Sequence, residues 1–211
     1  MTDGYYTVKK RGIGEIVEKK SKFIATVIPV VTNEEALAEI EALRSKYWDA
    51  RHNVYAYTLL DGQMKRYSDD GEPSGTAGMP ILNVLEKEEL KNVLVVVTRY
   101  FGGILLGTGG LVRAYSAAAK AGIDESGIVR RTKCSLIQIN CAYPLLGKIQ
   151  NYVAAREGAG IKDVLYTDAV SVSAYQTADG EQAFIAGVTE LTDGKAQITV
   201  TGTSYEDFDK I

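Results

Sequence analysis

A glycine-rich segment between Val93 and Tyr115 carries the clearest chemical signal in this chain of 211 residues. An apolar run ends in Arg99 and Tyr100, and glycines then gather before a helix pattern begins near Leu111. Glycine lets a backbone approach a ligand, and a helix N-terminus offers free N–H groups with partial positive charge. The segment therefore predicts a cradle for phosphate or another anion. The candidate phosphate or nucleic-acid ligands are Arg99, Tyr100, Gly102, Gly103, Gly107, Gly109, Gly110, Arg113, Lys65 and Arg66.

The same glycines admit a structural interpretation, in which they allow a helix to pack closely on a strand. They lack the Lys-Ser/Thr pair of a P-loop, and Val112 stands where a GxGxxG motif needs its third glycine. Arg113 lies in the expected first turn of the helix, where the helix dipole disfavours a cation by ~0.3–1 kcal/mol. We therefore expect Arg113 to have an anionic partner, either a phosphate or a nearby carboxylate.

Asp69, Asp70 and Glu72 form a second group, around Gly71 and just before Pro73. Three carboxylates at this spacing suit Mg²⁺ or acid and base catalysis, but they do not match a calcium-binding loop. We favour a tight turn in which the aspartates cap backbone N–H groups. The nearby Ser74 and Thr76 are candidate helix-capping hydroxyls, since no Gly-x-Ser-x-Gly elbow supports a nucleophile.

His52 is the only histidine, so a His-rich zinc site is excluded and one general base of this type remains. Val54 and Ala56 share its expected strand face, which favours a hydrogen-bonded, half-buried structural role. We assign no catalytic residue, no metal and no cofactor. The candidate cleft residues are His52, Asp69, Asp70, Glu72, Ser74 and Thr76.

The composition is that of a globular protein, with 45% hydrophobic and 24% charged residues. The net charge of −3 argues against coating nucleic acid by bulk electrostatics, so any polyanion contact should be local. No apolar run is long enough to cross a membrane, and the N-terminal segment lacks the apolar core of a signal peptide. Cys134 and Cys141 are seven residues apart on one expected strand, so their side chains face opposite ways and cannot pair. We expect a cytoplasmic protein with no membrane partner.

The pattern of elements predicts two domains, residues 1–131 and 132–211. The first part combines β-branched strands with amphipathic helices, one of which follows a capping box at Thr32–Glu35. The second part has the order β-α-β-β-α-β, which is typical of a ferredoxin-like arrangement. The expected strands of the second part are 134–140, 161–166, 169–175 and 196–203, and its expected helices are 144–157 and 182–191.

Four motifs of the first part resemble the YigZ/IMPACT family. They are AxHNxYAY at 50–57, RYSDDGEPSGTAGMP at 66–80, GMPILNVLEKEELKNVLVVVTRYFGGILLG at 78–107 and LGTGGLVRAY at 106–115. The trailing segment is also similar in length and order to the second domain of bacterial members. We see no departure from the family pattern within these motifs.

The resemblance implies an α+β fold. The first domain would resemble the second domain of a small-subunit ribosomal protein, a mixed sheet with helices on one side. The second would resemble the ferredoxin-like fifth domain of translocation GTPases. Eukaryotic members bind a ribosome-associated activator of an initiation-factor kinase, so the resemblance implies a link to translation. Such likeness of fold supports a function only by association.

We therefore expect a translation-linked binding protein that contacts RNA, the ribosome or a translation-associated protein, and we favour a non-enzymatic role. The alternative is a metal-dependent enzyme that acts on a phosphorylated or nucleotide-like small molecule. In that case the glycine segment would hold phosphate, the three carboxylates would hold the metal, and His52 would be the base.

Overall fold

The computed structural model describes residues 4–209, and its first sheet is built around strand β6 (Val93–Tyr100). Residues Val93 to Arg99 are all buried, as expected of a β-branched run covered on both faces. The sheet order is β2-β3-β6-β4-β5, and all of its neighbouring pairs are antiparallel. Its other strands are β2 (Gly12–Glu18), β3 (Ser21–Pro29), β4 (His52–Thr58) and β5 (Lys65–Ser68).

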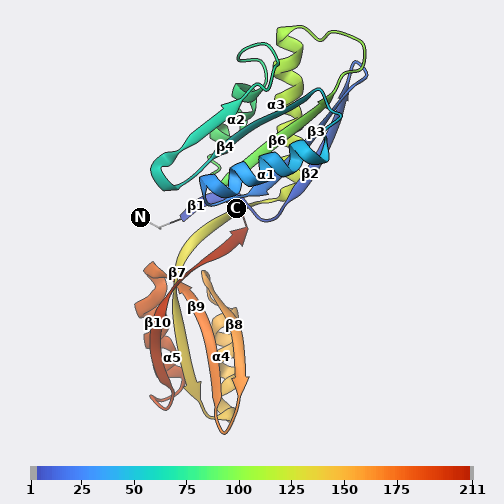
Figure 1. The fold of residues 1–211 in the computed structure, drawn as a ribbon. Coiled ribbons are helices and arrows are strands. Elements are labelled where there is room, and N and C mark those ends of the chain that lie inside the picture. Colours follow the sequence, from blue (N-terminus) through green and yellow to red (C-terminus); the bar gives the residue numbers. More distant parts are fainter. Residues whose placement is uncertain (1–3, 210–211) are drawn as a thin grey trace. The chain divides into compact units, whose positions relative to one another are not determined.

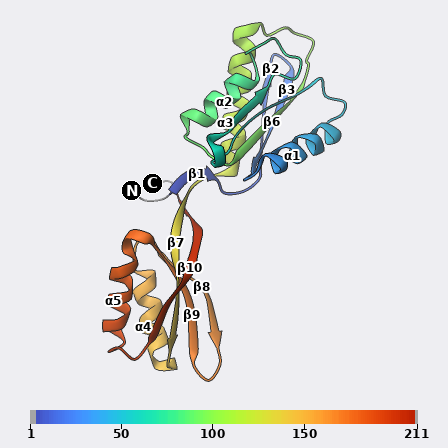
Figure 2. The same cartoon turned by 60° about the vertical axis from the view of Figure 1, so that its left-hand side comes forward.

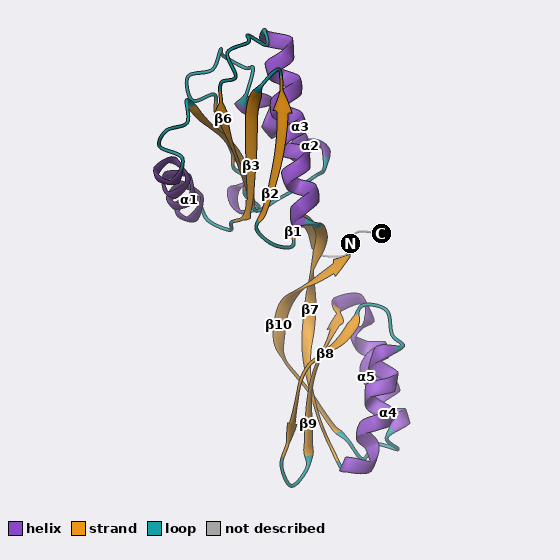
Figure 3. Ribbon diagram, turned by 90° about the vertical axis from the view of Figure 1, so that its right-hand side faces the viewer, coloured by secondary structure: helices purple, strands orange, loops and turns teal. Residues whose placement is uncertain are grey.

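Helices cover both faces of this sheet (Figure 3). Helix α1 (Asn33–Lys46) packs on one face, where Ile40 and Leu43 join Leu94 and Val96 in a buried cluster. Helices α2 (Gly78–Lys87) and α3 (Thr108–Ser126) cover the other face. The α+β class is confirmed, but the mixed sheet with helices on one side is wrong in detail. A central strand that is apolar on both faces needs cover on both faces.

One local prediction for the first part is confirmed. Thr32 and Glu35 form the capping box of α1, each accepting from the other's backbone N–H. Helix α3 lies close against β2 and β3, where a Cβ on Gly14 would be 2.4 Å from the Gly122 nitrogen. Strand β1 (Gly4–Val8) adds Val8 to the core beneath α2 and α3.

The second sheet has the strand order β1-β7-β9-β8, with β10 also pairing with β7, and the helices α4 and α5 lie on one of its faces (Figure 2). The predicted β-α-β-β-α-β order is confirmed, although the first and last strands are longer than expected. Ile149, Val153, Phe184 and Val188 of the helices are buried against the sheet. The elements are β7 (Ile128–Cys141), α4 (Tyr143–Ala154), β8 (Ala159–Tyr166), β9 (Val170–Thr177), α5 (Glu181–Leu191) and β10 (Gln197–Asp209), with short 3₁₀ turns at Asp61–Gln63 and Ala178–Gly180.

The chain divides into two units, Tyr5–Arg130 and Arg131–Phe208, and each has its own hydrophobic core.

Cys134 and Cys141 are both free thiols and both buried. Burial raises the pKa of the Cys134 thiol to about 11. None of the helices within residues 4–209 is long and apolar enough to cross a membrane.

Candidate functional site

Four loops of the first unit meet at one end of its sheet, where β6 finishes (Figure 1). The strand register brings them together, because His52 lies opposite Arg99 and Lys22 lies opposite Tyr100. We call this the loop end of the first unit. It consists of the β2–β3 turn, the α1–β4 loop, the segment between β5 and α2, and the glycine segment between β6 and α3.

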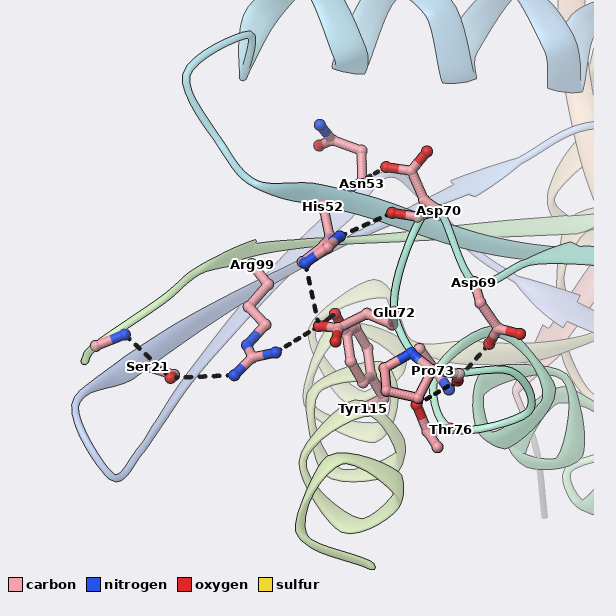
Figure 4. Close-up of polar contacts among 12 residues, drawn as sticks. Ser21, His52, Asn53, Asp69, Asp70, Glu72, Pro73, Thr76, Arg99 and Tyr115 are labelled. Carbon is pink, nitrogen blue, oxygen red and sulfur yellow. Dashed lines mark hydrogen bonds and ion pairs between the residues drawn. The ribbon is translucent and has the colours of Figure 1, made fainter. Parts of the chain in front are cut away.

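A buried ion pair joins two of these loops (Figure 4). Arg99 Nη1 lies 2.5 Å from Glu72 Oε1, and the two side chains are only 7% and 4% exposed. The guanidinium carbon lies 5.4 Å from the Phe23 ring centre and 5.6 Å from that of Phe101. Its Nε is buried and forms no hydrogen bond within the described residues. Arg99 thus faces a carboxylate inside the protein and is not available to an external phosphate in this structure.

Tyr115 completes this cluster from α3. Its hydroxyl donates to Glu72 Oε1 at 2.8 Å, and its ring meets that of Phe23 edge to face. Burial, and then the Glu72 carboxylate, raise the pKa of Tyr115 well above its ordinary value. The tyrosine therefore stays a neutral hydrogen-bond donor that holds Glu72 against the helix.

His52 occupies the edge of the same cluster and is 13% exposed at its side chain. Its Nδ1 lies 2.7 Å from the carbonyl oxygen of Asp70. A carbonyl can only accept, so Nδ1 donates the proton in this contact. The other ring nitrogen lies 3.9 Å from Glu72 Oε1. This is the hydrogen-bonded, half-buried position that the residues of its strand favoured.

The carboxylates of Asp69 and Asp70 point away from Glu72. Asp69 accepts from the backbone N–H groups of Gly75, Ala77 and Gly78, at 2.8, 3.1 and 2.8 Å. Asp70 accepts from the Asn53 N–H at 2.6 Å and lies 3.3 Å from Arg44 Nη2.

Each carboxylate of the acidic group is therefore engaged by a different part of the protein. Among the described residues no group of three His, Cys, Asp or Glu side chains is arranged to hold a metal. The metal site suggested for Asp69, Asp70 and Glu72 is not formed, because the tight turn at Asp70 and Gly71, both with positive φ, spreads the three side chains.

Ser74 and Thr76 do not cap helix α2, as the sequence suggested. The Thr76 hydroxyl donates to the Pro73 carbonyl at 2.7 Å, and Ser74 is exposed. Asp69 instead satisfies the amides before and at the start of the helix, including that of Gly78. An aspartate nine residues upstream can do this because the intervening segment folds back on itself.

The glycine segment is divided between packing and open surface. The Gly102 N–H donates to Ser21 Oγ at 3.1 Å, and a Cβ on Gly102 would lie 2.0 Å from the Lys20 carbonyl carbon. Gly103 and Gly107 have positive φ, and a Cβ on either would meet nothing within 4 Å. Gly102 is thus a packing residue, whereas Gly103 and Gly107 lie on open surface.

Helix α3 begins directly after Gly107 without a side-chain cap. The first N–H to bond back is that of Leu111, which donates to the Gly107 carbonyl. The amides of Thr108, Gly109 and Gly110 precede the first helical hydrogen bond and lack an intrahelical acceptor. This helix end is the feature that the sequence predicted as an anion cradle.

Several cations at the loop end are unpaired. Arg113 is exposed on the first turns of α3 and has no ion-pair partner among the described residues. Lys19, Lys20 and Arg51 are also exposed and, within residues 4–209, likewise lack a carboxylate partner. Two carboxylates lie beside them: Glu18 is exposed at the end of β2, and Asp49 accepts from the Tyr100 hydroxyl at 2.9 Å. The loop end therefore presents unpaired cations as exposed groups, although the chain as a whole is acidic.

Lys65 and Arg66 do not belong to this surface. They lie on β5 opposite Thr58 and Tyr57, near the start of β6, whereas the glycine segment follows its end. Lys65 is paired with Glu86 at 2.6 Å. The sequence could not separate them from the loop end, because the short strand β5 was not predicted.

Sequence reasoning missed other residues of this end. Tyr115 and Ser21 were passed over, although Tyr115 follows Arg113 by two positions. Lys19 and Lys20 belong to the basic run Lys19-Lys20-Ser21-Lys22, and such a run is more typical of a solvated strand edge than of a binding patch. Arg51 was also missed. It directly precedes His52, and a cation at the start of a strand could have indicated a binding residue.

Comparisons with known proteins agree with this architecture. A family model described as the Impact N-terminal domain matches residues 19–123, and a domain of unknown function (DUF1949) matches residues 139–195. The IMPACT family member YvyE of Bacillus subtilis (strain 168) is 41% identical over 206 residues, 97% of this chain and 94% of that protein. YigZ of Escherichia coli (strain K12) is 38% identical over 143 residues, 66% of this chain and 70% of its own length.

A solved structure titled "Crystal structure of an hypothetical protein" superposes with a TM-score of 0.60 at 30% identity, over 95% of this chain and 98% of that one. Protein IMPACT of Mus musculus is 38% identical over 96 residues, 44% of this chain and 30% of its own. Fold and motifs thus define a two-domain α+β protein with an Impact-type first domain. The chain belongs to the IMPACT family, as the sequence motifs indicated.

Proposed function

We propose that this chain is a translation-linked binding protein that contacts RNA phosphates, on the ribosome or on a ribosome-associated particle, through the loop end of its first unit. The observation that carries the proposal is the uncapped start of α3 with Arg113 unpaired beside it. A Cβ on Gly109 would lie 3.6 Å from Arg113 Nη1, so guanidinium and helix start face the same space.

The distribution of unpaired cations over the loop end favours binding of an extended anion over binding of a small one. Lys19 and Lys20 occupy a β-turn whose backbone touches Gly102, and Arg51 precedes the strand that pairs with β6. These cations belong to two different loops, so together with Arg113 at the start of α3 they suit successive phosphates of a chain. Such contacts position a nucleic acid without reading its sequence.

The first unit offers no comparable support for catalysis on a small molecule. Glu72 is held by Arg99 and Tyr115, and Asp69 and Asp70 are engaged by backbone amides. The two buried, free thiols fit a protein that works in the cytoplasm, which is where we propose it acts.

Co-sedimentation with ribosomes tests the proposal. The test variant carries Lys20→Gln, Arg51→Gln and Arg113→Gln at the loop end. The matched control carries Lys10→Gln, Lys87→Gln and Lys148→Gln, which are exposed and elsewhere on the chain. We expect the test variant to lose binding and the control, with the same change in net charge, to retain it. Equal loss in both, or no ribosome binding by the wild-type chain, would overturn the proposal.

A further inference from the structure

Trp48 is the only tryptophan of the chain, and it is 82% exposed. It follows Tyr47, the C-cap of α1, in the α1–β4 loop, and among the described residues its ring and N–H have no partner. Tryptophan is usually well buried, because its large ring gains more than most side chains from leaving water. An exposed ring of this size at the loop end requires an explanation other than stability.

The loop that carries Trp48 is held in place on both sides. The Tyr47 N–H donates to the Leu43 carbonyl at 2.9 Å, and the Ala50 N–H donates to the Tyr47 carbonyl at 3.0 Å. Asp49, the next residue, accepts from the Tyr100 hydroxyl at the end of β6. Trp48 therefore lies on a turn whose backbone is already fixed by hydrogen bonds. Stacking of a ligand on its ring costs little conformational entropy of the backbone.

The charges around the ring identify the kind of ligand. Lys46 lies 5.0 Å from the Tyr47 ring centre, and Arg51 is exposed three residues after Trp48. The Asp49 carboxylate between them in the sequence accepts from the Tyr100 hydroxyl, which fixes its direction but leaves its charge. A flat exposed ring with two cations close to it in the sequence suits a base with its phosphates, because every base offers a stacking face. A protein partner would also fit the ring, but it would not require the flanking cations.

We propose that Trp48 stacks on an unpaired base, so that the RNA recognised at the loop end is single-stranded at this point. This inference rests on the proposed RNA contact and adds the class of RNA to it. In a duplex the bases are already stacked and their faces are covered, so Trp48 distinguishes single strands from duplexes.

The single tryptophan makes the test direct, because all tryptophan fluorescence comes from this ring. The probes are oligouridylate, oligoadenylate and the duplex formed by annealing the two. We expect both single strands to quench the fluorescence of the wild-type chain and the duplex to leave it nearly unchanged. Binding of the same probes by Trp48→Ala is followed by anisotropy of labelled RNA. Tyr166→Ala, which removes a ring 58% exposed in the second unit, is the control.

Trp48→Ala is expected to weaken single-strand binding roughly tenfold while leaving duplex binding and the melting temperature unchanged, and Tyr166→Ala is expected to leave RNA binding as it is. If Trp48→Ala binds single strands as tightly as the wild type, in a salt-dependent manner, the stacking proposal is overturned and the phosphate contact stands. If the wild-type chain binds none of the probes and no ribosomes, the proposed function fails and this inference fails with it.

Discussion

The carboxylate of Glu72 lies 2.5 Å from the guanidinium of Arg99, and more than nine-tenths of both side chains is removed from solvent. The pair ties the segment between β5 and α2 to the end of the central strand. Because Glu72 and Arg99 bind each other inside the protein, neither is available to a ligand. The exposed cations around the pair are therefore the groups that face a ligand.

Replacing Glu72 by glutamine tests whether this ion pair holds the segment in place. Glu72→Gln keeps the shape of the side chain but leaves the Arg99 charge buried without a counter-charge, which typically costs about 3–5 kcal/mol of unfolding free energy. Glu15→Gln removes half of an exposed pair with Lys22 and is the control, with an expected cost below about 1 kcal/mol. Urea unfolding measures both. Equal costs would mean that the buried pair does not hold the loop.

The pH dependence of stability should report on Tyr115. Its pKa is raised in the folded state by burial and by Glu72, so above a pH of about 10 the unfolded chain loses this proton and the folded chain keeps it. The stability contributed by Tyr115 is complete below that pH and declines as the pH rises above it.

Tyr115→Phe is therefore expected to flatten the alkaline loss of stability. It also removes a hydrogen bond to a carboxylate, at a cost of about 1.5–3 kcal/mol near neutral pH. Urea midpoints measured across the alkaline range give both effects. The account of Tyr115 is contradicted if the variant and the wild type decline in parallel.

Asp69 should matter as the cap of α2. Asp69→Ala leaves the amides of Gly75, Ala77 and Gly78 without their acceptor and should cost about 0.5–2 kcal/mol. Hydrogen exchange at these three amides should accelerate, while exchange in β9 of the second unit should not. Unchanged exchange at the three amides would show that water or another group replaces the cap.

Gly102 should not tolerate a side chain. Gly102→Ala places a Cβ 2.0 Å from the Lys20 backbone and is expected to lower the free energy of unfolding by about 1–3 kcal/mol. Gly147 lies within α4, with nothing within 4 Å of an added Cβ, so Gly147→Ala should stabilise the chain by about 0.5–1 kcal/mol. Thermal unfolding distinguishes the two, and equal behaviour would argue against tight packing at Gly102.

Local patterns in the sequence predicted much of this fold. The buried central strand, the Thr32–Glu35 capping box and the β-α-β-β-α-β order of the second unit all follow from spacing along the chain. The sequence analysis did not predict that helices pack on both faces of the first sheet, although the continuous apolar run at β6 already implied this. The short exposed strand β5 was missed because four polar residues carry almost no apolar pattern.

The candidate site was predicted only in part. The sequence indicated His52, Glu72 and Arg99 as candidate site residues. It could not show that the Glu72 side chain points inward to Arg99 while that of Asp69 points toward α2. Those directions depend on the positive φ of Asp70 and Gly71 and on strand register, which are tertiary properties. The placement of Lys20, Arg51 and Arg113 at the same end of the sheet likewise depends on how two loops and the start of α3 are arranged in space.

The salt dependence of ribosomal RNA binding tests the central claim most directly. If about four phosphates are neutralised at the loop end, log affinity should fall against log salt with a slope of about −3 to −4. Arg113→Gln should weaken binding and make the slope shallower by about one, while Lys148→Gln should change neither. A slope near zero for the wild-type chain, or the same slope and affinity for Arg113→Gln, would contradict the account.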